Sequence, residues 1–159
     1  MHGKVRLKVA NIEFIARSEE MVKADAAQAL KVGAYVMIES SKGAQNVDCV
    51  LLATGSEVPL AVKAREVLEA EGVGTRVVSM PCTELFDRLS CEQRRQILTD
   101  APKVAIEASV TGLWYKYVGN GAVIGIDSFG ESAPAGVLWE KFGFTVDRVV
   151  NAAKKLLTH

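Results

Sequence analysis

The sequence predicts an α/β fold: a three-layer α/β/α sandwich around a five-stranded mixed sheet, with four parallel strands and one antiparallel strand. Short apolar runs alternate with amphipathic helical patterns along most of the chain, which is typical of parallel strands joined by helices. One connection, the polar segment Ser40–Asn46, is too short to hold a crossover helix. The strands that it joins therefore cannot be parallel neighbours, and Ala34–Ile38 is expected to be the antiparallel strand.

The segment Val47–Glu71 predicts the strand–turn–helix unit around which the sheet is organised. The apolar run Val50–Ala53 has no polar side, as expected for a strand that is buried on both faces. Thr54-Gly55-Ser56 ends this run, and the Ser56 hydroxyl is expected to cap the helix that follows. Pro59 suits the first turn of that helix, because its missing N–H costs little there.

The central helix is expected to bury one apolar face. The residues of this face recur at helical spacing and are Leu60, Ala61, Ala64, Val67 and Leu68. Gly72 is expected to end the helix, because glycine readily takes the left-handed conformation found at many helix ends.

Residues 1–33 give the weakest pattern, and we interpret them as a linker or N-terminal extension that precedes one domain over residues 34–159. Within the extension, Ser18–Leu30 begins with a capping serine and acidic residues and keeps helical spacing, which predicts a helix ended by Gly33. The stretch Val5–Ile15 mixes apolar and polar residues without a clean alternation beyond a few positions.

Beyond the central unit, strands and helices continue to alternate. The expected strands are Thr75–Met80, Lys103–Ala108 and Ala122–Ile126. The expected helices are Ser90–Leu98, one or two turns within Gly112–Val118, Ser132–Phe142, and a last helix capped by Thr145.

Composition argues against several classes of function. The 19 basic and 19 acidic residues give a formal net charge of zero, and no basic stripe occurs, which argues against nucleic acid or an anionic membrane as a partner. No apolar run approaches the roughly 20 residues of a membrane span. Cys49, Cys82 and Cys91 lack C-x-x-C spacing and predict free thiols in a cytosolic protein.

The only histidines are His2 and His159, one near each end of the chain. Chain ends are usually mobile, so no internal histidine is available as a general base or a metal ligand. This argues against a Ser-His-Asp triad, a Cys–His pair and a histidine zinc site. We therefore assign no catalytic, cofactor-binding or metal-binding residue within the chain.

Gly55 and Ser56 form a candidate anion site, because ligands of open α/β sheets bind at the carboxyl ends of strands, near helix N-termini. No glycine-rich dinucleotide motif or Walker motif is present, and Glu57 would repel a phosphate. A plain capped turn is the alternative.

Glu107 lies near the end of an apolar strand, where a carboxylate is costly unless it has a partner. It suits a functional acid or base, or a charge that is paired structurally or across an interface. Without a nearby histidine or a second carboxylate, the sequence favours the paired charge.

Trp114, Tyr115 and Tyr117 are unusually dense for a chain with 6% aromatic residues. Aromatic side chains anchor interfaces, and they also fill cores, so both interpretations stay open. Together with Glu107, these three residues are our candidate interface.

Six stretches of the chain match one family in order and spacing. They are LLATGSEV (51–58), RVVSMP (76–81), ELFD (84–87), KVAIEA (103–108), LWYKYVG (113–119) and FGESAPAGVLWEKFGFTVDRVV (129–150). Together they resemble the C-terminal domain of transketolase from about Gly33 to Leu157, and the last stretch is the most specific.

The resemblance implies a cytoplasmic enzyme of the pentose phosphate pathway, or a plastid enzyme in a photosynthetic eukaryote. Such an enzyme moves a two-carbon ketol unit between sugar phosphates, uses thiamine diphosphate and a divalent metal (Mg²⁺ or Ca²⁺), and works as a homodimer. The resemblance also implies that the other two domains bind the cofactor, the metal and most of the substrate. This chain is then expected to bind neither the cofactor nor the metal and to be inactive alone. Its expected partners are the remaining domains and a second subunit.

The chain lacks several motifs of the complete enzyme: the metal-binding GDG motif, the activating glutamate and the active-site histidines. The Ser-Arg-Gln-Asn-like stretch of the preceding domain is also absent, and neither Arg6 nor Arg17 has its neighbours. Two alternatives remain. One is an independent module that binds a small anion or nucleotide near Gly55, and the other is the C-terminal domain of a 2-oxoacid dehydrogenase beta subunit.

Overall fold

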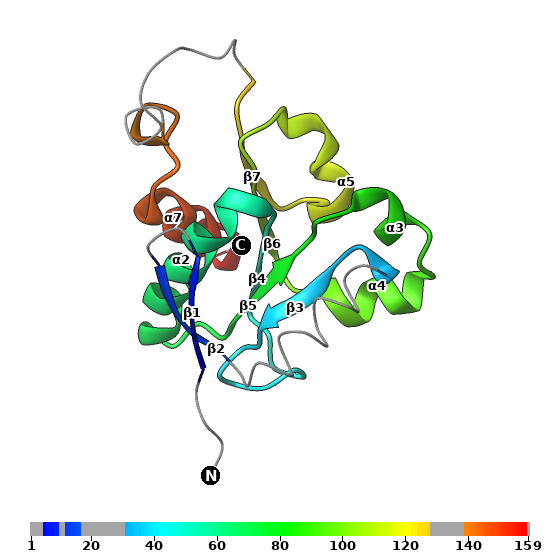
Figure 1. Cartoon of the computed structure of the whole chain (residues 1–159), viewed down its shortest axis with the longest axis horizontal. Coiled ribbons are helices and arrows are strands. Elements are labelled where there is room, and N and C mark those ends of the chain that lie inside the picture. The colour runs from blue at the N-terminus through cyan, green and yellow to red at the C-terminus, as the bar shows by residue number, and fades with distance from the viewer. Residues whose placement is uncertain (1–4, 10–11, 17–30, 128–138, 159) are drawn as a thin grey trace.

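The computed structural model describes residues 5–9, 12–16, 31–127 and 139–158. Its main sheet has five strands in the order β3-β5-β4-β6-β7 (Figure 1). The strands are β3 (Tyr35–Ile38), β4 (Cys49–Ala53), β5 (Thr75–Ser79), β6 (Lys103–Ile106) and β7 (Ala122–Ile124). Strand β3 is antiparallel to β5, and the other neighbours are parallel, which confirms the predicted mixed sheet.

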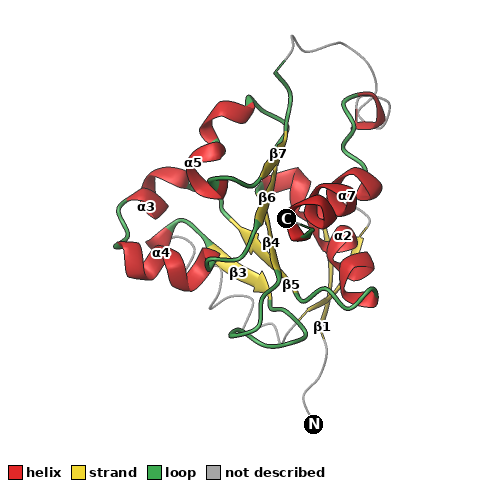
Figure 2. Ribbon diagram, turned by 180° about the vertical axis from the view of Figure 1, so that it is seen from behind, coloured by secondary structure: helices red, strands yellow, loops and turns green. Residues whose placement is uncertain are grey.

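Helices cover both faces of this sheet (Figure 2), which confirms the three-layer sandwich. One face carries α2 (Val58–Ala70) and α7 (Val146–Leu157). The other carries α3 (Thr83–Asp87), α4 (Cys91–Leu98) and α5 (Tyr115–Val118).

Strand β4 lies at the centre of the sheet, and all five of its residues are fully buried. Because successive side chains of a strand point to opposite faces, Leu51 and Ala53 pack on the α2–α7 side. Val50 and Leu52 pack with Phe86 of α3 in the second core. The continuous apolar run is therefore explained by burial on two faces.

The predicted helix caps at Ser90 and Thr145 are confirmed. The Ser90 hydroxyl accepts a hydrogen bond from the Gln93 N–H at 3.2 Å, and the Gln93 side chain accepts one from the Ser90 N–H at 3.0 Å. The Thr145 hydroxyl accepts a hydrogen bond from the Arg148 N–H at 3.3 Å. Gly72, with φ of +82°, follows the end of α2 as expected.

The start of α2 differs from the prediction. A short 3-10 turn, η1 (Gly55–Glu57), precedes it, so Ser56 does not cap the helix and its hydroxyl instead donates to the Glu57 carboxylate. Pro59 does lie in the first turn. The buried face also includes Val62, whereas Val67 is 39% exposed.

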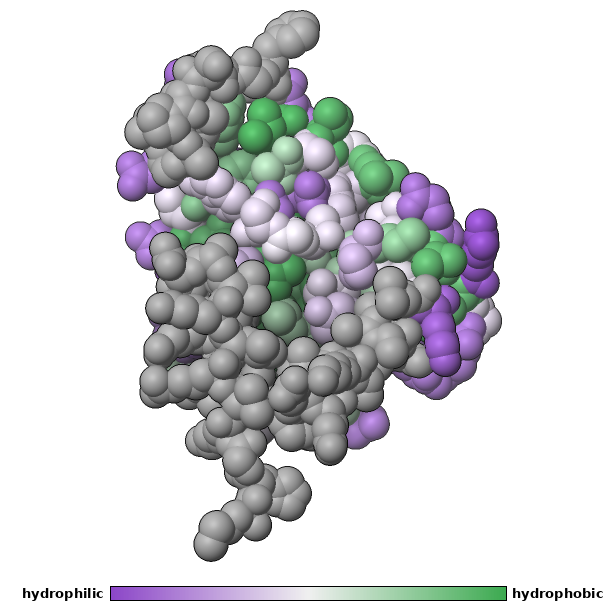
Figure 3. Space-filling view, in the orientation of Figure 1, coloured by the Kyte–Doolittle hydropathy of each residue, from purple (hydrophilic) through white to green (hydrophobic). Residues whose placement is uncertain are grey.

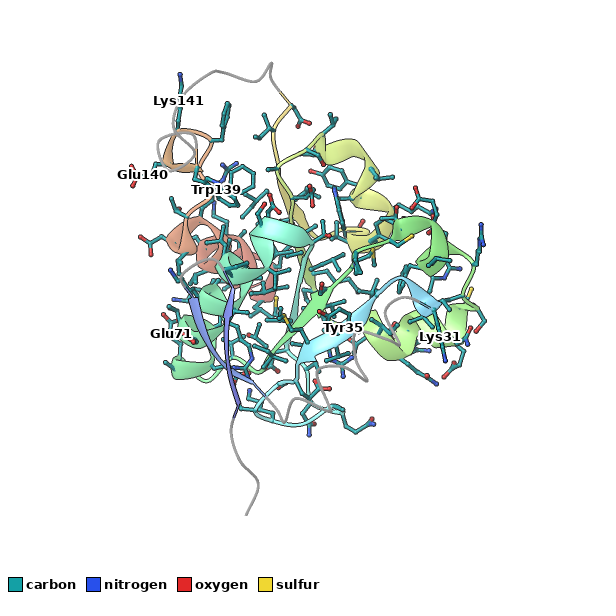
Figure 4. All side chains as sticks on the ribbon, in the orientation of Figure 1. Lys31, Tyr35, Glu71, Trp139, Glu140 and Lys141 are labelled. Carbon is teal, nitrogen blue, oxygen red and sulfur yellow. The ribbon has the colours of Figure 1, made fainter. Side chains whose placement is uncertain are left out.

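Side-chain contacts join the two helices of the α2–α7 layer. The Lys154 ammonium of α7 pairs with the carboxylate of Glu71, the residue that follows α2. Glu71 is labelled in Figure 4. Just before α7, the rings of Trp139 and Phe144 meet edge to face, with centroids 4.9 Å apart. Tyr35, also labelled in Figure 4, lies on the edge strand β3.

Outside the main sheet, β1 (Val5–Val9) and β2 (Ile12–Ala16) form a separate antiparallel pair that we did not predict. The expected helix Ser18–Leu30 falls outside the described residues, as does most of the expected helix Ser132–Phe142. The boundary between an extension and a domain near residue 33 stays a prediction. Within the described part, no helix has both the length and the apolar character that a membrane crossing needs.

Candidate functional site

The carboxyl edge of the parallel sheet brings two glutamates together. Strands β4 and β6 are parallel neighbours, with Ala53 opposite Ile106 at their carboxyl ends. The chain then leads from β4 into η1, which holds Glu57, and from β6 directly to Glu107. The sequence placed Glu57 in the turn after one strand and Glu107 near the end of another, but it could not show that the two strands are neighbours.

Glu57 is a buried carboxylate with two partners. Glu57 is only 4% exposed. Oε1 accepts a hydrogen bond from the Ala108 N–H at 3.3 Å, and Oε2 accepts one from the Ser56 hydroxyl at 3.0 Å. The bond to Ala108 ties η1 to the end of β6 and holds Glu57 beside the residue that follows Glu107.

Glu107 is only partly buried, but its Oε2 atom is shielded from solvent and accepts no hydrogen bond among the described residues. Burial, and then the negative charge of Glu57, raise the pKa of Glu107 from 4.5 to about 7. The structure thus corrects our expectation that no second carboxylate lies nearby. In the described part of the chain, the charged group that acts on Glu107 is an anion, so the paired charge is not formed there.

Gly55 and Ser56 lie at the same edge and are exposed. Gly55 has φ of +54°, a conformation that glycine adopts easily. The Ser56 hydroxyl donates to Glu57, and two carboxylates repel an anion. The anion site stays a prediction, and this geometry disfavours it.

The aromatic segment divides between core and surface. Trp114 and Tyr117 are 3% and 7% exposed, and their rings lie 5.8 Å apart. Tyr117 also meets Phe86 at 5.9 Å and donates a hydrogen bond to Asp87 at 3.2 Å. Tyr115, in contrast, is 50% exposed. Of the three, only Tyr115 is exposed, so the interface interpretation rests on it and on Glu107.

An exposed apolar surface lies close to Glu107 in the chain. Val110, Leu113 and Tyr115 are 67%, 55% and 50% exposed, and they are three of the five large hydrophobic residues exposed in the described chain. We call these three residues the 110–115 patch; it spans η2 (Thr111–Leu113) and the start of α5. Figure 3 shows hydrophobic surface at the end of the molecule that carries α5 and β7. Exposed apolar groups gathered in this way are typical of binding surfaces.

The backbone under the 110–115 patch is held firmly. Asp127 accepts hydrogen bonds from the N–H and the hydroxyl of Thr111 at 2.9 and 2.8 Å. The Ile126 N–H donates to the Ser109 carbonyl at 2.9 Å. A side chain at Gly125 would lie 2.7 Å from that same carbonyl, so only glycine allows this close approach. The patch is therefore pre-formed.

The family model for the Transketolase-like TK C-terminal domain matches residues 33–145, which include the sheet, the carboxylate pair and the 110–115 patch. The chain belongs to the transketolase family. Transketolase 1 of Escherichia coli is 52% identical over 128 residues, which are 79% of this chain and 19% of that protein. Transketolase 2 of Vibrio parahaemolyticus is 51% identical over 150 residues, 92% of this chain and 21% of that protein. The chain thus spans about a fifth of these transketolases.

Solved transketolase structures share the fold. The transketolase from Leishmania mexicana superposes with a TM-score of 0.75 at 42% identity, over 82% of this chain and 19% of that one. A structure described as a split gene transketolase, an inactive beta4 tetramer, superposes with a TM-score of 0.59 at 30% identity. This chain covers 43% of that shorter transketolase chain.

The described residues do not fit the cofactor that transketolases imply. No group of three or more His, Cys, Asp or Glu side chains within them could hold a metal ion. The carboxylate pair lies at the N-terminal end of α2, where it would repel a diphosphate. We therefore assign no residue of this part of the chain to thiamine diphosphate or its metal.

The raised pKa of Glu107 predicts a stability that depends on pH. Because the folded chain holds the proton of Glu107 more tightly, the contribution of this group to stability is fully present below pH 4.5 and is lost as pH rises through about 7. Since the side chain is only partly buried and solvent screens the repulsion, we expect a loss of about 1–2 kcal/mol. Urea unfolding across this range should show this decline in the free energy of unfolding, and Glu107→Gln should abolish it.

Glu66 provides the matched control for this experiment, because it is an exposed glutamate on α2. Glu66→Gln should keep the decline of the original chain. A Glu107→Gln variant whose stability still falls as steeply with rising pH would contradict the assignment to Glu107.

Proposed function

We propose that this chain is the C-terminal segment of a transketolase whose complete polypeptide transfers a two-carbon ketol unit between sugar phosphates. The observation that carries this proposal is the match to the C-terminal domain model over residues 33–145, with more than half of the residues identical to Transketolase 1 of Escherichia coli. Thiamine diphosphate and a divalent metal belong to the rest of that polypeptide, and the reaction places the enzyme in the pentose phosphate pathway of the cytoplasm. No finding favours an anion-binding module or a 2-oxoacid dehydrogenase.

Within that enzyme, we propose that this segment contributes structure and assembly surface. Its 110–115 patch and Glu107 would pack against the remaining domains or the second subunit of a homodimer. The exposure of the patch and the unpartnered Glu107 oxygen support this role. The similarity to a chain described as a split gene transketolase supports the idea that a transketolase can consist of more than one polypeptide.

The chain alone is expected to have no ketol-transfer activity. Activation of thiamine diphosphate requires positioned acid and base groups and a metal that anchors the diphosphate, and the described residues hold no cluster that could bind such a metal. The assay follows transfer from xylulose 5-phosphate to ribose 5-phosphate with thiamine diphosphate and Mg²⁺ supplied. Turnover of about 1 per second or more would contradict the proposal.

A chimera gives the positive arm of this test. Residues 33–157 of this chain would replace the matching segment of Escherichia coli Transketolase 1, which is 52% identical over 128 residues. The chimera is expected to assemble and to transfer ketol units. A well-folded chimera without activity would count against the proposed function. The control is Transketolase 1 from which the matching segment has been removed without a replacement.

A further inference from the structure

We propose that the Glu57–Glu107 pair receives a positively charged side chain, an arginine or lysine, from the preceding part of the transketolase polypeptide when that part packs on the 110–115 patch. The inference rests on the proposed function and adds the chemistry of the contact. Glu107 and the patch lie on one short segment at the carboxyl edge of the sheet, since Glu107 follows β6 directly and Val110 lies three residues later. Glu57 reaches this segment from η1 through its bond to the Ala108 N–H.

The pair needs a cation because the described residues leave it with uncompensated negative charge. Both oxygens of Glu57 have donors, from Ala108 and Ser56. The Oε2 atom of Glu107 has none among the described residues. Leaving a shielded charged group without a donor is costly, and a charge-assisted bond from a guanidinium or ammonium group removes that cost.

The geometry allows such a side chain to reach Glu107. The glutamate is only partly buried, and the three residues after it, Ala108–Val110, are exposed. Rotation about the last side-chain torsion of a glutamate is broad, so the shielded oxygen can turn toward the surface. The apolar patch supplies contact area beside this charged point, as interfaces commonly combine an apolar centre with charged groups.

The preceding polypeptide is the occupant favoured by the size of the chain. Relatives are about four times as long, since 79% of this chain covers only 19% of Escherichia coli Transketolase 1, and the matched model is a C-terminal domain. Within the described chain, the lysine of the patch segment, Lys116, is already paired with Asp87 at 2.7 Å. A cation for Glu107 is therefore expected from outside this segment.

Docking should release a proton, because a cation favours the ionised form of Glu107. The charged group that acts on this glutamate among the described residues is Glu57 from η1, while Asp127 after β7 is bound to Thr111 of the neighbouring segment. The pKa of Asp127 is lowered by hydrogen bonds from the Thr111 backbone and then its side chain, so Asp127 does not titrate in the same range as Glu107. Docking should thus strengthen as pH rises through about 7, in contrast to the stability of the free chain.

The test compares amide hydrogen exchange of β6, η2 and α5 in the free chain and in the chimera, because exchange reports local opening. In the free chain above neutral pH, Glu107→Gln should slow exchange, by about threefold to tenfold. In the chimera, the same change should speed exchange by about tenfold or more, because a charge-assisted bond is lost. Glu107→Lys should enlarge the effect in the chimera, and the Glu66→Gln control should have none in either protein.

The outcomes separate this inference from the proposed function. An original chimera that is folded but inactive overturns the function itself. The chimera can also be active while Glu107→Gln and Glu107→Lys change its exchange in the same direction as in the free chain. That result overturns the cation contact alone. If the free chain instead self-associates and Glu107→Lys abolishes that association, a second copy is the occupant and the inference is wrong.

Discussion

Replacement of Arg76 by methionine is expected to destabilise the chain by about 3–5 kcal/mol, because it removes a buried guanidinium together with its ion pair and its hydrogen bonds to other elements. Arg76 lies on β5 and is only 3% exposed. Its guanidinium donates to both carboxylate oxygens of Glu39, at 2.9 and 2.8 Å. It also donates to the carbonyls of Gln96 and Ile97, each at 2.9 Å. One side chain thus joins β5, the end of β3 and the end of α4.

Thermal unfolding provides the measurement. For a domain of this size, the expected loss corresponds to a midpoint about 6–20 °C lower. Arg95→Met is the matched control. Arg95 lies on α4, the helix that Arg76 contacts, and forms an exposed ion pair with Asp100. That change should cost about 1 kcal/mol or less. Equal losses for the two variants would show that the Arg76 contacts are not the source of the stability.

Arg76 also shows where prediction from the sequence stops. The run Thr75–Met80 predicted a buried strand, and the structure confirms it as β5, Thr75–Ser79. The partners of its one charged residue, Arg76, lie 37, 20 and 21 residues away in the chain. The caps at Ser90 and Thr145 and the apolar runs depend on neighbours in sequence and were predicted correctly, unlike the cap at Ser56. The Arg76 contact depends instead on the packing of distant elements.

The carboxylate pair has the same explanation. Glu57 and Glu107 were each placed at the end of a strand, but their proximity depends on β4 and β6 being neighbours in the sheet. Strand order follows from the whole topology and was not predicted. The sequence therefore favoured a paired charge at Glu107, while the structure supplies a second carboxylate.

Trp114→Ala is expected to destabilise the chain by about 3–5 kcal/mol, as for other large buried side chains. The indole packs with Tyr117 in the core formed by α3, α4 and α5. Its Nε1 atom is buried and has no hydrogen-bond partner among the described residues. Trp114→Phe should therefore cost much less than Trp114→Ala, because the aromatic contact is largely kept and no hydrogen bond is lost.

Tyr115→Ala is the contrasting variant, because Tyr115 follows Trp114 in the sequence but is 50% exposed. It should change the stability of the free chain by about 0.5 kcal/mol or less. In the chimera, loss of an aromatic anchor should weaken assembly by about tenfold or more. Urea unfolding of the free chain and sedimentation of the chimera measure the two effects. If Tyr115→Ala leaves the sedimentation of the chimera unchanged, the 110–115 patch has no role in assembly. If it unfolds the free chain, the Tyr115 ring packs in the core as that of Trp114 does.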